Sequence, residues 1–358
     1  MKSLHIVGSK AMGGAERWFV RFLRSLRSRG HDAEALVRRG YDLANGELGE
    51  IPFQSLPMRT VWDPLSRYEV GRLVRRSGAP VVQTYMGRAT RLTRLPRHGD
   101  QVHLARLGGY YKLDGYRHAH YWIGNTRGLC DYLVENGFPA DRVFHIYNFA
   151  EPPRVVPDEE QTEIRERFGL SRDDLVLLTP GRFVPVKGHP ELLEAISRLP
   201  AEVAGRRVRL LLLGDGALGP ELRELVRQLR IEDRVVWAGW QSDPAPFYQA
   251  ADVVVFPSRY NETLGNVVLE AWSHHTPLVT TEFRGAMEIV QAGEDAWRVP
   301  CESPGELAAG IRRVAEDPGL QREMVANGVR RLDEDFSERA VMRQYLELYQ
   351  TLVEAGPR

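Results

Sequence analysis

The sequence lacks most of what marks a secreted, membrane-spanning or metal-binding protein. Its 358 residues include two cysteines, Cys130 and Cys301, which are too far apart for a metal-binding or redox pair. Apolar runs are no longer than strand-like pieces such as 208–213, well short of the roughly 20 residues that span a bilayer. Residues 1–8 enter a strand-like run at once, without a cleavable signal pattern. These absences predict a cytoplasmic protein with reduced thiols.

The net charge of the whole chain is zero, but the charges are unevenly distributed along it. Residues 1–154 contain 24 Lys and Arg against 14 Asp and Glu, a balance of +10, which leaves a balance of −10 for residues 155–358. Such asymmetry indicates that the basic half meets an anionic partner, with attraction between the two halves as the alternative. Nucleic acid is not the predicted partner, because the basic half contains no recognised nucleic-acid-reading motif.

What the sequence does contain is a regular alternation of strand-like and helix-like segments. A chain of this length exceeds the size of one hydrophobic core, so two domains are expected. Alternating strands and helices predict parallel sheets covered by helices. The fold class is therefore α/β, with two doubly wound Rossmann-like domains facing across a cleft. A proline-rich stretch at 151–157 suggests the boundary, giving domains 1–154 and 155–337, with a final helix at about 338–358 that packs back on the first domain.

The stretch 257–290 carries the most chemistry. An apolar run, 252–256, stops at Pro257-Ser258, and a helix is predicted to begin near Gly265-Asn266. The first amides of such a helix lack intrahelical partners and lie at the positive end of its dipole, which suits a phosphate. Glu262 stands before this helix start and Glu270 inside the helix. Two carboxylates beside a phosphate-binding helix start could bind the hydroxyls on either side of the diphosphate of a nucleotide sugar. The alternative is that they are ordinary solvated acids at a helix start.

Three more loops that follow predicted strands are rich in glycine. They are 8–14 with Gly13-Gly14, the basic loop 181–188 with Arg182 and Lys187, and 214–216 with Gly214 and Gly216. Ligands of doubly wound sheets bind outside the carboxyl ends of the strands, so these loops are the expected site. Gly13-Gly14 before a helix allows close approach of a ligand to the backbone, but it is not a complete dinucleotide-binding fingerprint.

Taken together, the order and spacing of four segments resemble the retaining GT-B glycosyltransferases of sequence family four. The segments are Gly13-Gly14-Ala-Glu16, Gly181-Arg182 with Lys187-Gly188, Leu212-Leu-Gly214-Asp-Gly216, and Pro257-Ser258 with Glu262, Gly265 and Glu270. The resemblance spans nearly the whole chain. It implies an enzyme that transfers a hexose-type sugar from a nucleotide-diphosphate sugar, most often UDP-linked and next most often GDP-linked.

The resemblance also implies a role for each matching residue. Arg182 and Lys187 would hold the donor diphosphate and neutralise it as it leaves, and Glu262 would bind hydroxyls of the transferred sugar; these three form the predicted catalytic set. Glu270 would bind the ribose. The remaining predicted donor contacts are Gly13, Gly14, Gly214, Gly216, Gln241, Thr263, Leu264, Gly265 and Asn266.

No metal and no cofactor besides the donor are predicted. Fixed cations and helix-end amides can stabilise a leaving diphosphate electrostatically, without a divalent ion. The Asp-x-Asp letters at 333–335 follow a helix near the C-terminus and are expected to be a surface helix end. The family often has a histidine after the strand that ends near Thr84, whereas this chain reads Gln83-Thr-Tyr-Met86. His103, His118 and His120 are nearby in sequence, with surface or core roles expected.

The acceptor is predicted from the basic half. Arg88, Arg91, Arg94 and Arg97 recur every three residues and would form one stripe if the segment were helical. Such charge suits a lipopolysaccharide or other envelope acceptor, or a phosphorylated lipid-linked one, handled at the inner face of the cell membrane by peripheral contact with anionic lipid. A solvated basic surface and a small soluble acceptor are the alternative. A nucleotide-sugar epimerase and a non-catalytic nucleotide-sugar-binding protein remain alternative functions.

Overall fold

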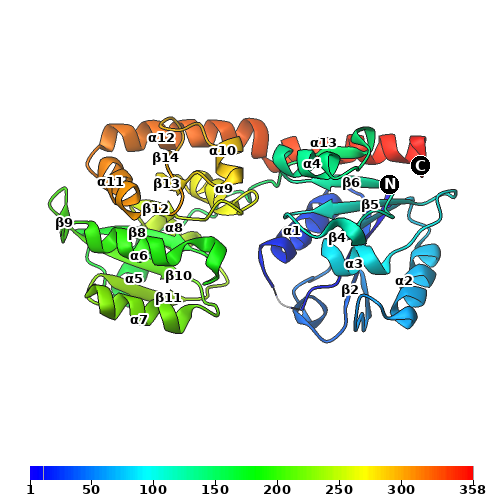
Figure 1. Cartoon of the computed structure of the whole chain (residues 1–358), viewed down its shortest axis with the longest axis horizontal. Helices are drawn as coiled ribbons and strands as arrows, with labels where there is room; N and C mark the ends of the chain where they lie inside the picture. Colours follow the sequence, from blue (N-terminus) through cyan, green and yellow to red (C-terminus); the bar gives the residue numbers. More distant parts are fainter. Residues whose placement is uncertain (11, 358) are drawn as a thin grey trace. The chain divides into compact units, whose positions relative to one another are not determined.

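The structure is a computed structural model that describes residues 1–10 and 12–357 (Figure 1). The chain divides into two compact units. The first consists of Met1–Asn148 together with the segment from Glu338 onward, and the second of Phe149–Ser337. Each unit is built around its own parallel sheet.

The sheet of the first unit has the order β3-β2-β1-β4-β5-β6-β7, with parallel pairing throughout. Its strands are β1 (Lys2–Val7), β2 (Asp32–Arg38), β3 (Phe53–Leu56), β4 (Val81–Tyr85), β5 (Val102–Leu107), β6 (Tyr121–Gly124) and β7 (Val143–His145). The central strands β4 and β5 are buried along their whole length, because helices cover both faces of the sheet.

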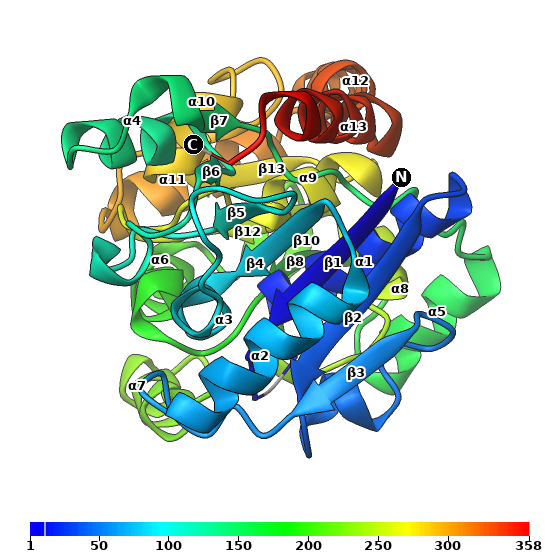
Figure 2. The ribbon, with the colours of Figure 1, turned by 90° about the vertical axis from the view of Figure 1, so that its right-hand side faces the viewer.

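The helices of this unit are α1 (Gly14–Ser28), α2 (Pro64–Ser77), α3 (Met86–Leu92), α4 (Arg127–Glu135) and α13 (Glu338–Ala355), with short 3₁₀ turns η1 (Asp42–Asn45), η2 (Leu113–Gly115) and η3 (Ala140–Arg142). Alternate residues of β1 point to opposite faces. Leu4 and Ile6 join a core with α2 and α3, the two helices in front of the sheet in Figure 2, whereas His5 meets Phe22 of α1. This unit is therefore doubly wound.

The helix α13 packs on the first unit through aromatic and polar contacts. Tyr345 accepts a hydrogen bond from Arg106 Nε at 3.1 Å, and the Tyr349 hydroxyl donates to Gln83 Oε1 at 2.6 Å. At the start of the helix, the Glu338 carboxylate accepts from Ser25 Oγ at 2.7 Å. These contacts tie the end of the chain to the unit that contains its beginning.

Of three neighbouring histidines in the first unit, His103 and His120 are buried and His118 is half-buried. His103 bonds through Nε2 to Thr84 Oγ1 at 2.9 Å, and His118 through Nε2 to Thr90 O at 2.8 Å. The His103 amide donates to His120 Nδ1 at 3.1 Å. Burial lowers the pKa of all three imidazoles, that of His120 to about 4. All three are therefore neutral near pH 7, His103 and His120 in the core and His118 at its margin.

The sheet of the second unit has the order β11-β10-β8-β12-β13-β14, all parallel, with the short β9 antiparallel to β10. Its strands are β8 (Asp174–Pro180), β9 (Glu202–Val203), β10 (Arg206–Leu213), β11 (Val235–Gly239), β12 (Val253–Phe256), β13 (Leu278–Thr281) and β14 (Trp297–Val299). The central β8 is buried at every residue, which again indicates layers on both faces.

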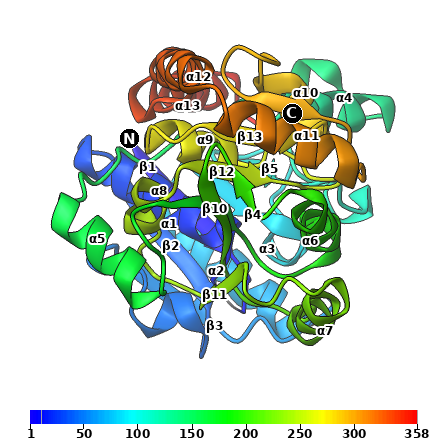
Figure 3. The same ribbon diagram turned by 90° about the vertical axis from the view of Figure 1, so that its left-hand side faces the viewer.

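Helices flank this second sheet on both sides: α5 (Asp158–Arg167), α6 (His189–Arg198), α7 (Gly219–Leu229), α8 (Ala245–Ala250), α9 (Asn266–Ser273), α10 (Arg284–Ile289), α11 (Pro304–Ala315) and α12 (Pro318–Arg331), with the turns η4 (Pro185–Lys187) and η5 (Leu332–Phe336). Figure 3 shows α6, α7 and α11 along one side of the strands and α5 and α8 along the other. The predicted fold class is confirmed for each unit.

The unit boundary differs from the predicted one by six residues, because 149–154 belong to the second unit. The Ala150 amide donates to Phe336 O at 3.0 Å, and Ser273 Oγ donates to Glu151 O at 2.8 Å. Arg154 pairs with Glu160 and Asp243, both at 2.8 Å. A stretch that reads as a proline-rich linker is thus partly fixed to the second sheet by its own contacts.

Among the described residues, none of the helices combines the length and apolar content needed to cross a membrane. Both cysteines are free thiols.

Candidate functional site in the second unit

Four neighbouring strands of the second sheet bring the predicted donor residues to one edge. β8 is followed by the loop of Arg182 and Lys187, β10 by Gly214–Gly216, β11 by Gln241 and β12 by Glu262. The sheet order β11-β10-β8-β12 makes these strands adjacent, and all four run in the same direction. Their carboxyl ends therefore meet, as expected for a ligand site in a parallel sheet.

At the centre of this edge, Lys187 pairs with Glu262. The Lys187 Nζ lies 3.0 Å from Glu262 Oε2, and each side chain is less than a fifth exposed. Lys187 Nζ also lies 4.8 Å from the centroid of the Phe256 ring, a cation–π contact at the end of β12. Two residues 75 positions apart in sequence thus form one ion pair whose side chains are both partly exposed.

The loop of Lys187 is held against the loop of Glu262 by main-chain bonds. The Arg259 amide donates to Val186 O at 2.8 Å, and the Glu262 amide donates to Arg259 O at 3.0 Å. The Arg259 guanidinium in turn binds Glu191 of α6, with Nε to Oε1 at 2.9 Å. These bonds give the Lys187–Glu262 pair a fixed frame.

His189, directly after Lys187-Gly188, packs beneath the surface next to Phe183. It is fully buried, and its ring lies edge-on to that of Phe183 at 4.9 Å between centroids. Burial, together with the nearby charge of Lys187, lowers the pKa of His189 to about 4. The imidazole is therefore neutral near pH 7, in keeping with a packing role.

Arg182 is the exposed cation of the site. Within the part of the chain that the structure describes, it forms no ion pair, in contrast to Lys187. The backbone beside it is fixed, because the Gly181 amide donates to Leu213 O and the Phe183 amide to Asp215 O, both at 2.9 Å. The same bonds align Gly214–Gly216 with the Arg182 loop.

The helix start that was predicted near Gly265-Asn266 is confirmed. Gly265, with φ of 73°, precedes the first helical residue, Asn266. Thr263 and Leu264, which come directly before Gly265, are both buried. Gln241 lies in the turn after β11, where its side-chain Nε2 donates to Ala238 O at 2.8 Å.

Glu270 has a partner that the sequence pattern did not reveal. The Tyr248 hydroxyl, from α8, donates to Glu270 Oε2 at 2.6 Å, and the Tyr248 ring stacks on His274 with 5.0 Å between centroids. His274 is in the turn after α9. The carboxylate is thus oriented by a buried tyrosine and retains its second oxygen, Oε1, for a ligand. Tyr248 is an apolar-face residue of a six-residue helix, and its spacing carries no functional signal.

Gly13 and Gly14 belong to the first unit. Gly13 precedes α1 with extended backbone, and its carbonyl accepts the Arg17 amide at 3.0 Å. A Cβ at Gly13 would lie 3.0 Å from Glu16 Oε2, so the glycine leaves room for that carboxylate. The two glycines thus open a helix, as predicted, in the unit that does not contain Lys187.

The predicted arginine stripe does not exist as one surface. Arg88 and Arg91 are in α3, which ends at Leu92, whereas Arg94 and Arg97 follow in an irregular segment and are exposed. The Arg88 side chain turns inward and donates to Met58 O and Arg59 O. Pro96 disfavours helical backbone at the residue before it, which is consistent with the early end of the helix.

No group of three or more potential metal-ligating side chains occurs in residues 1–10 and 12–357. Asp333, Glu334 and Asp335 are exposed in η5 at the end of α12, the helix end that the sequence predicted.

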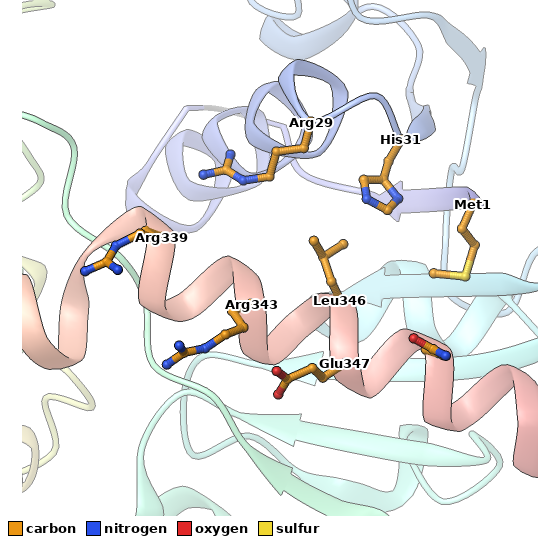
Figure 4. Close-up of a pocket in the computed structure, with 8 residues that line it drawn as sticks. Met1, Arg29, His31, Arg339, Arg343, Leu346 and Glu347 are labelled. Carbon is orange, nitrogen blue, oxygen red and sulfur yellow. The ribbon is translucent and has the colours of Figure 1, made fainter.

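A hollow of about 490 Å³ lies between α13, the end of α1 and the start of the chain (Figure 4). Arg29, Arg339 and Arg343 line it together with Met1 and His31. It is at the amino end of β1, opposite to the edge where parallel sheets bind ligands. It contains none of the predicted site residues.

Solved structures share this pair of units. The Anabaena protein Alr3699/HepE, solved in complex with UDP and glucose, matches with a TM-score of 0.84 and 20% identity over 98% of this chain and 100% of that one. A glycosyltransferase from Rickettsia africae also gives a TM-score of 0.84, with 18% identity over 98% of each chain. The fold class is therefore GT-B, that of two Rossmann-like domains.

Sequence relatives then define the family. The family described as "Glycosyl transferases group 1" matches residues 160–331. The lipopolysaccharide core biosynthesis glycosyltransferase LpsE of Rhizobium meliloti (strain 1021) is 32% identical over 342 residues, 94% of this chain and 95% of that protein. LpsD of the same organism, which has the same description, is 31% identical over 356 residues, 98% of each. The chain belongs to the glycosyl transferases group 1 family and is a glycosyltransferase.

Proposed function

We propose that this protein is a retaining, metal-independent glycosyltransferase that moves a sugar from a nucleotide-diphosphate sugar to a cell-envelope acceptor. The Lys187–Glu262 pair carries the proposal, because it places a cation and a sugar-binding carboxylate together beside the start of α9. The Lys187 ammonium would pair with the donor diphosphate, and the Glu262 carboxylate would accept hydrogen bonds from hydroxyls of the attached sugar. Arg182 supplies a second cation that is already exposed.

In the proposed reaction, the acceptor oxygen attacks the anomeric carbon on the face from which the diphosphate leaves. The bond between that carbon and the phosphate oxygen breaks, the new glycosidic bond forms, and the acceptor proton passes to the leaving phosphate oxygen. Lys187 and Arg182 stabilise the charge that develops on the diphosphate, with the helix-start amides at Gly265 and Asn266. No side chain then needs to act as a general base.

In the donor-free enzyme, Glu262 neutralises Lys187. Donor binding exchanges this contact for two others, the ammonium with the diphosphate and the carboxylate with a sugar hydroxyl. Each charge gains a partner as it loses one, so neither is left uncompensated in a partly buried site.

The names of relatives support the choice of donor and acceptor. Alr3699/HepE was solved with UDP and with UDP-glucose, which supports a UDP-sugar donor here, with a GDP-sugar second. LpsE and LpsD are named for lipopolysaccharide core biosynthesis, which supports an envelope acceptor. Neither comparison favours an epimerase or a non-catalytic nucleotide-sugar-binding protein.

Nucleotide binding tests the donor site through Glu270. We expect the full chain to bind UDP in calorimetric titrations, and Glu270→Gln to weaken binding about tenfold or more, because a charge-assisted bond to the ribose contributes about 1.5–3 kcal/mol. Tyr248→Phe should weaken binding less, since the carboxylate keeps its charge but loses its orienting hydroxyl. Glu306→Gln, an exposed carboxylate of α11 in the same unit, is the matched control.

Equal UDP affinity in Glu270→Gln and the unsubstituted protein would contradict the ribose role. A titration with GDP and ADP in parallel distinguishes the base: tighter binding of GDP would revise the donor but keep the mechanism, whereas no binding of any nucleotide would remove the donor proposal altogether.

For an envelope acceptor we also propose peripheral contact with anionic lipid, made by the exposed face of α2 and the loop before it, together with the exposed Arg94 and Arg97. Trp62, Leu65 and Tyr68 are 77%, 73% and 66% exposed. The same face of α2 continues with Arg72, Arg75 and Arg76, all exposed. Exposed aromatic and apolar side chains next to cations suit the interface of an anionic bilayer.

Vesicle flotation tests this contact. We expect the full chain to float with phosphatidylglycerol-containing vesicles and not with neutral ones, and Arg72→Gln/Arg75→Gln/Arg76→Gln to lower partitioning by about two orders of magnitude, at about 1 kcal/mol per cation. Arg312→Gln/Arg322→Gln/Arg330→Gln removes as many exposed cations from the second unit and should float normally. Equal flotation with neutral vesicles, or none with either, would refute the contact.

A further inference from the structure

Four neighbouring strands of the first sheet each lead into a cation at the carboxyl edge. Lys10 follows β1, Arg38 is the last residue of β2, Arg59 follows β3, and Arg88 is in α3 directly after β4. The sheet order β3-β2-β1-β4 makes these strands adjacent, and all are parallel. Residues far apart in sequence are thereby gathered at the edge where such sheets bind ligands.

Two of these cations share one backbone oxygen. Arg88 Nη1 donates to Met58 O at 2.9 Å and to Arg59 O at 2.8 Å, and Arg38 Nη2 donates to the same Arg59 O at 3.5 Å. Arg38 also donates from Nε to Pro57 O at 3.3 Å. Two guanidinium groups around one neutral carbonyl oxygen repel each other, and the carbonyl offsets only part of that repulsion.

A third cation reaches the same place through Tyr41. The Arg38 guanidinium carbon lies 4.6 Å from the centroid of the Tyr41 ring, and Lys10 Nζ lies 6.0 Å from it. Both cations, Arg38 and Lys10, are attracted to the π electrons of this ring. Lys10 is exposed, so the cluster is open to solvent on this side.

Lys10, Arg38 and Arg88 form no ion pair with a carboxylate among the described residues. Arg38 is only 7% exposed, and its Nη1 is buried without a hydrogen-bond partner in the described part of the chain. Arg59 differs from the other three because, together with the hydrogen bond from Ser66, its charge helps to lower the pKa of Asp63. Two nearby carboxylates are used elsewhere. Asp42 accepts the Met12 amide at 2.8 Å, and Asp63 caps α2 by accepting the Leu65 amide at 3.1 Å.

The backbone around the cluster is shaped to hold it. A Cβ on Gly8 would lie 2.8 Å from Arg88 Cδ, so only a glycine at the end of β1 leaves room for that side chain. Met58 and Met86 both have positive φ, 42° and 60°, which is uncommon for residues other than glycine. Burial and the charge of Arg38 lower the pKa of Arg88, as expected for uncompensated cations. Strained backbone and unpaired charge are typical of binding sites.

We propose that Lys10, Arg38 and Arg88 form a binding site for an anionic group of the acceptor, either a phosphate or the carboxylate of an acidic sugar. The inference rests on the proposed function in that the ligand is taken to be the acceptor. Arg38 and Arg88 are charge-assisted donors from two sides, and Lys10 is the exposed cation that an entering anion meets first. The positive charge of residues 1–154 would thus serve in part to bind an anionic acceptor.

Calorimetric titration of the full chain with inorganic phosphate, glucuronate and neutral glucose tests the proposal. The protein would carry Arg182→Ala and Lys187→Ala, so that the cations of the donor site do not contribute. We expect phosphate or glucuronate, but not glucose, to bind, and Arg88→Gln to weaken the preferred anion about tenfold or more. Lys10→Gln, a change at an exposed position with no cost to folding, should weaken it about threefold. Arg117→Gln, an exposed arginine of the same unit outside both the cluster and the proposed lipid contact, should bind as the parent does.

The preferred probe identifies the source: tighter binding of phosphate indicates a phosphorylated acceptor, and tighter binding of glucuronate an acidic sugar. Unchanged affinity in both Arg88→Gln and Lys10→Gln, or no binding of either anion, would overturn the site and leave the arginines as clamps of the loop 57–59. The outcome is independent of the donor proposal. If UDP failed to bind the unsubstituted protein while the anion still bound here, the function would fail and this site would stand.

Discussion

Lys187→Ala is expected to lower the rate of sugar transfer by about two to three orders of magnitude, the usual effect of removing one preorganised group that stabilises developing negative charge. Lys187 lies 3.0 Å from Glu262 at the edge of the second sheet, where a donor diphosphate would displace the carboxylate. Alanine leaves Arg182 as the remaining side-chain cation of that loop, and Arg182 is exposed to water, where its field is weaker.

The measurement is the initial rate of nucleoside diphosphate release from the donor, with and without a cell-envelope acceptor fraction. Arg322→Ala, which removes an exposed cation of α12 in the same unit, is the control and should keep the full rate. Thermal unfolding of both variants shows whether the fold is retained. A Lys187→Ala protein that transfers sugar at the rate of the control would refute the leaving-group role.

The Lys187–Glu262 ion pair also shows which features of the site could be predicted from the sequence. The strand-loop-helix pattern of 252–273 predicted both the position of Glu262 and the helix start at Asn266, because period and punctuation are local properties. That Lys187 and Glu262 touch depends on the pairing of β8 with β12, which is a long-range property of the sheet. The family resemblance supplied this juxtaposition in advance; the spacing of the residues alone did not.

The arginine stripe was predicted wrongly, and Tyr248 was missed, because both depend on long-range packing. The arginine stripe assumed that a spacing of three continues as a helix, but α3 ends at Leu92 and the Arg88 side chain is drawn to the carbonyl groups of another loop. Side-chain direction after a strand is set by the neighbouring strands, which the local sequence does not specify. Tyr248 was missed for a similar reason, since its hydroxyl reaches Glu270 only through the packing of α8 and α9.

Gly188→Ala is expected to lower the free energy of unfolding of the second unit by about 3–5 kcal/mol and to disrupt the donor site with it. Gly188 has φ of 65°, a region that costs a residue with a side chain about 1–2 kcal/mol. Its Cβ would also lie 1.9 Å from Pro257 O, in the backbone of the loop that carries Glu262. Neither backbone can move alone, because the Arg259 amide binds Val186 O across the two loops.

The matched control is Gly169→Ala in the same unit. Gly169 has φ of 64°, almost the same backbone, but its Cβ would meet nothing within 4 Å. Gly169→Ala should therefore lower the free energy of unfolding only by the conformational cost, about 1–2 kcal/mol, and should retain UDP binding. Thermal and urea unfolding of the full chain measure both variants, and the excess loss at Gly188 reports the contact with Pro257. Equal losses in the two variants would mean that the loops of Lys187 and Glu262 can separate at little cost, so that their ion pair is not held by a rigid frame.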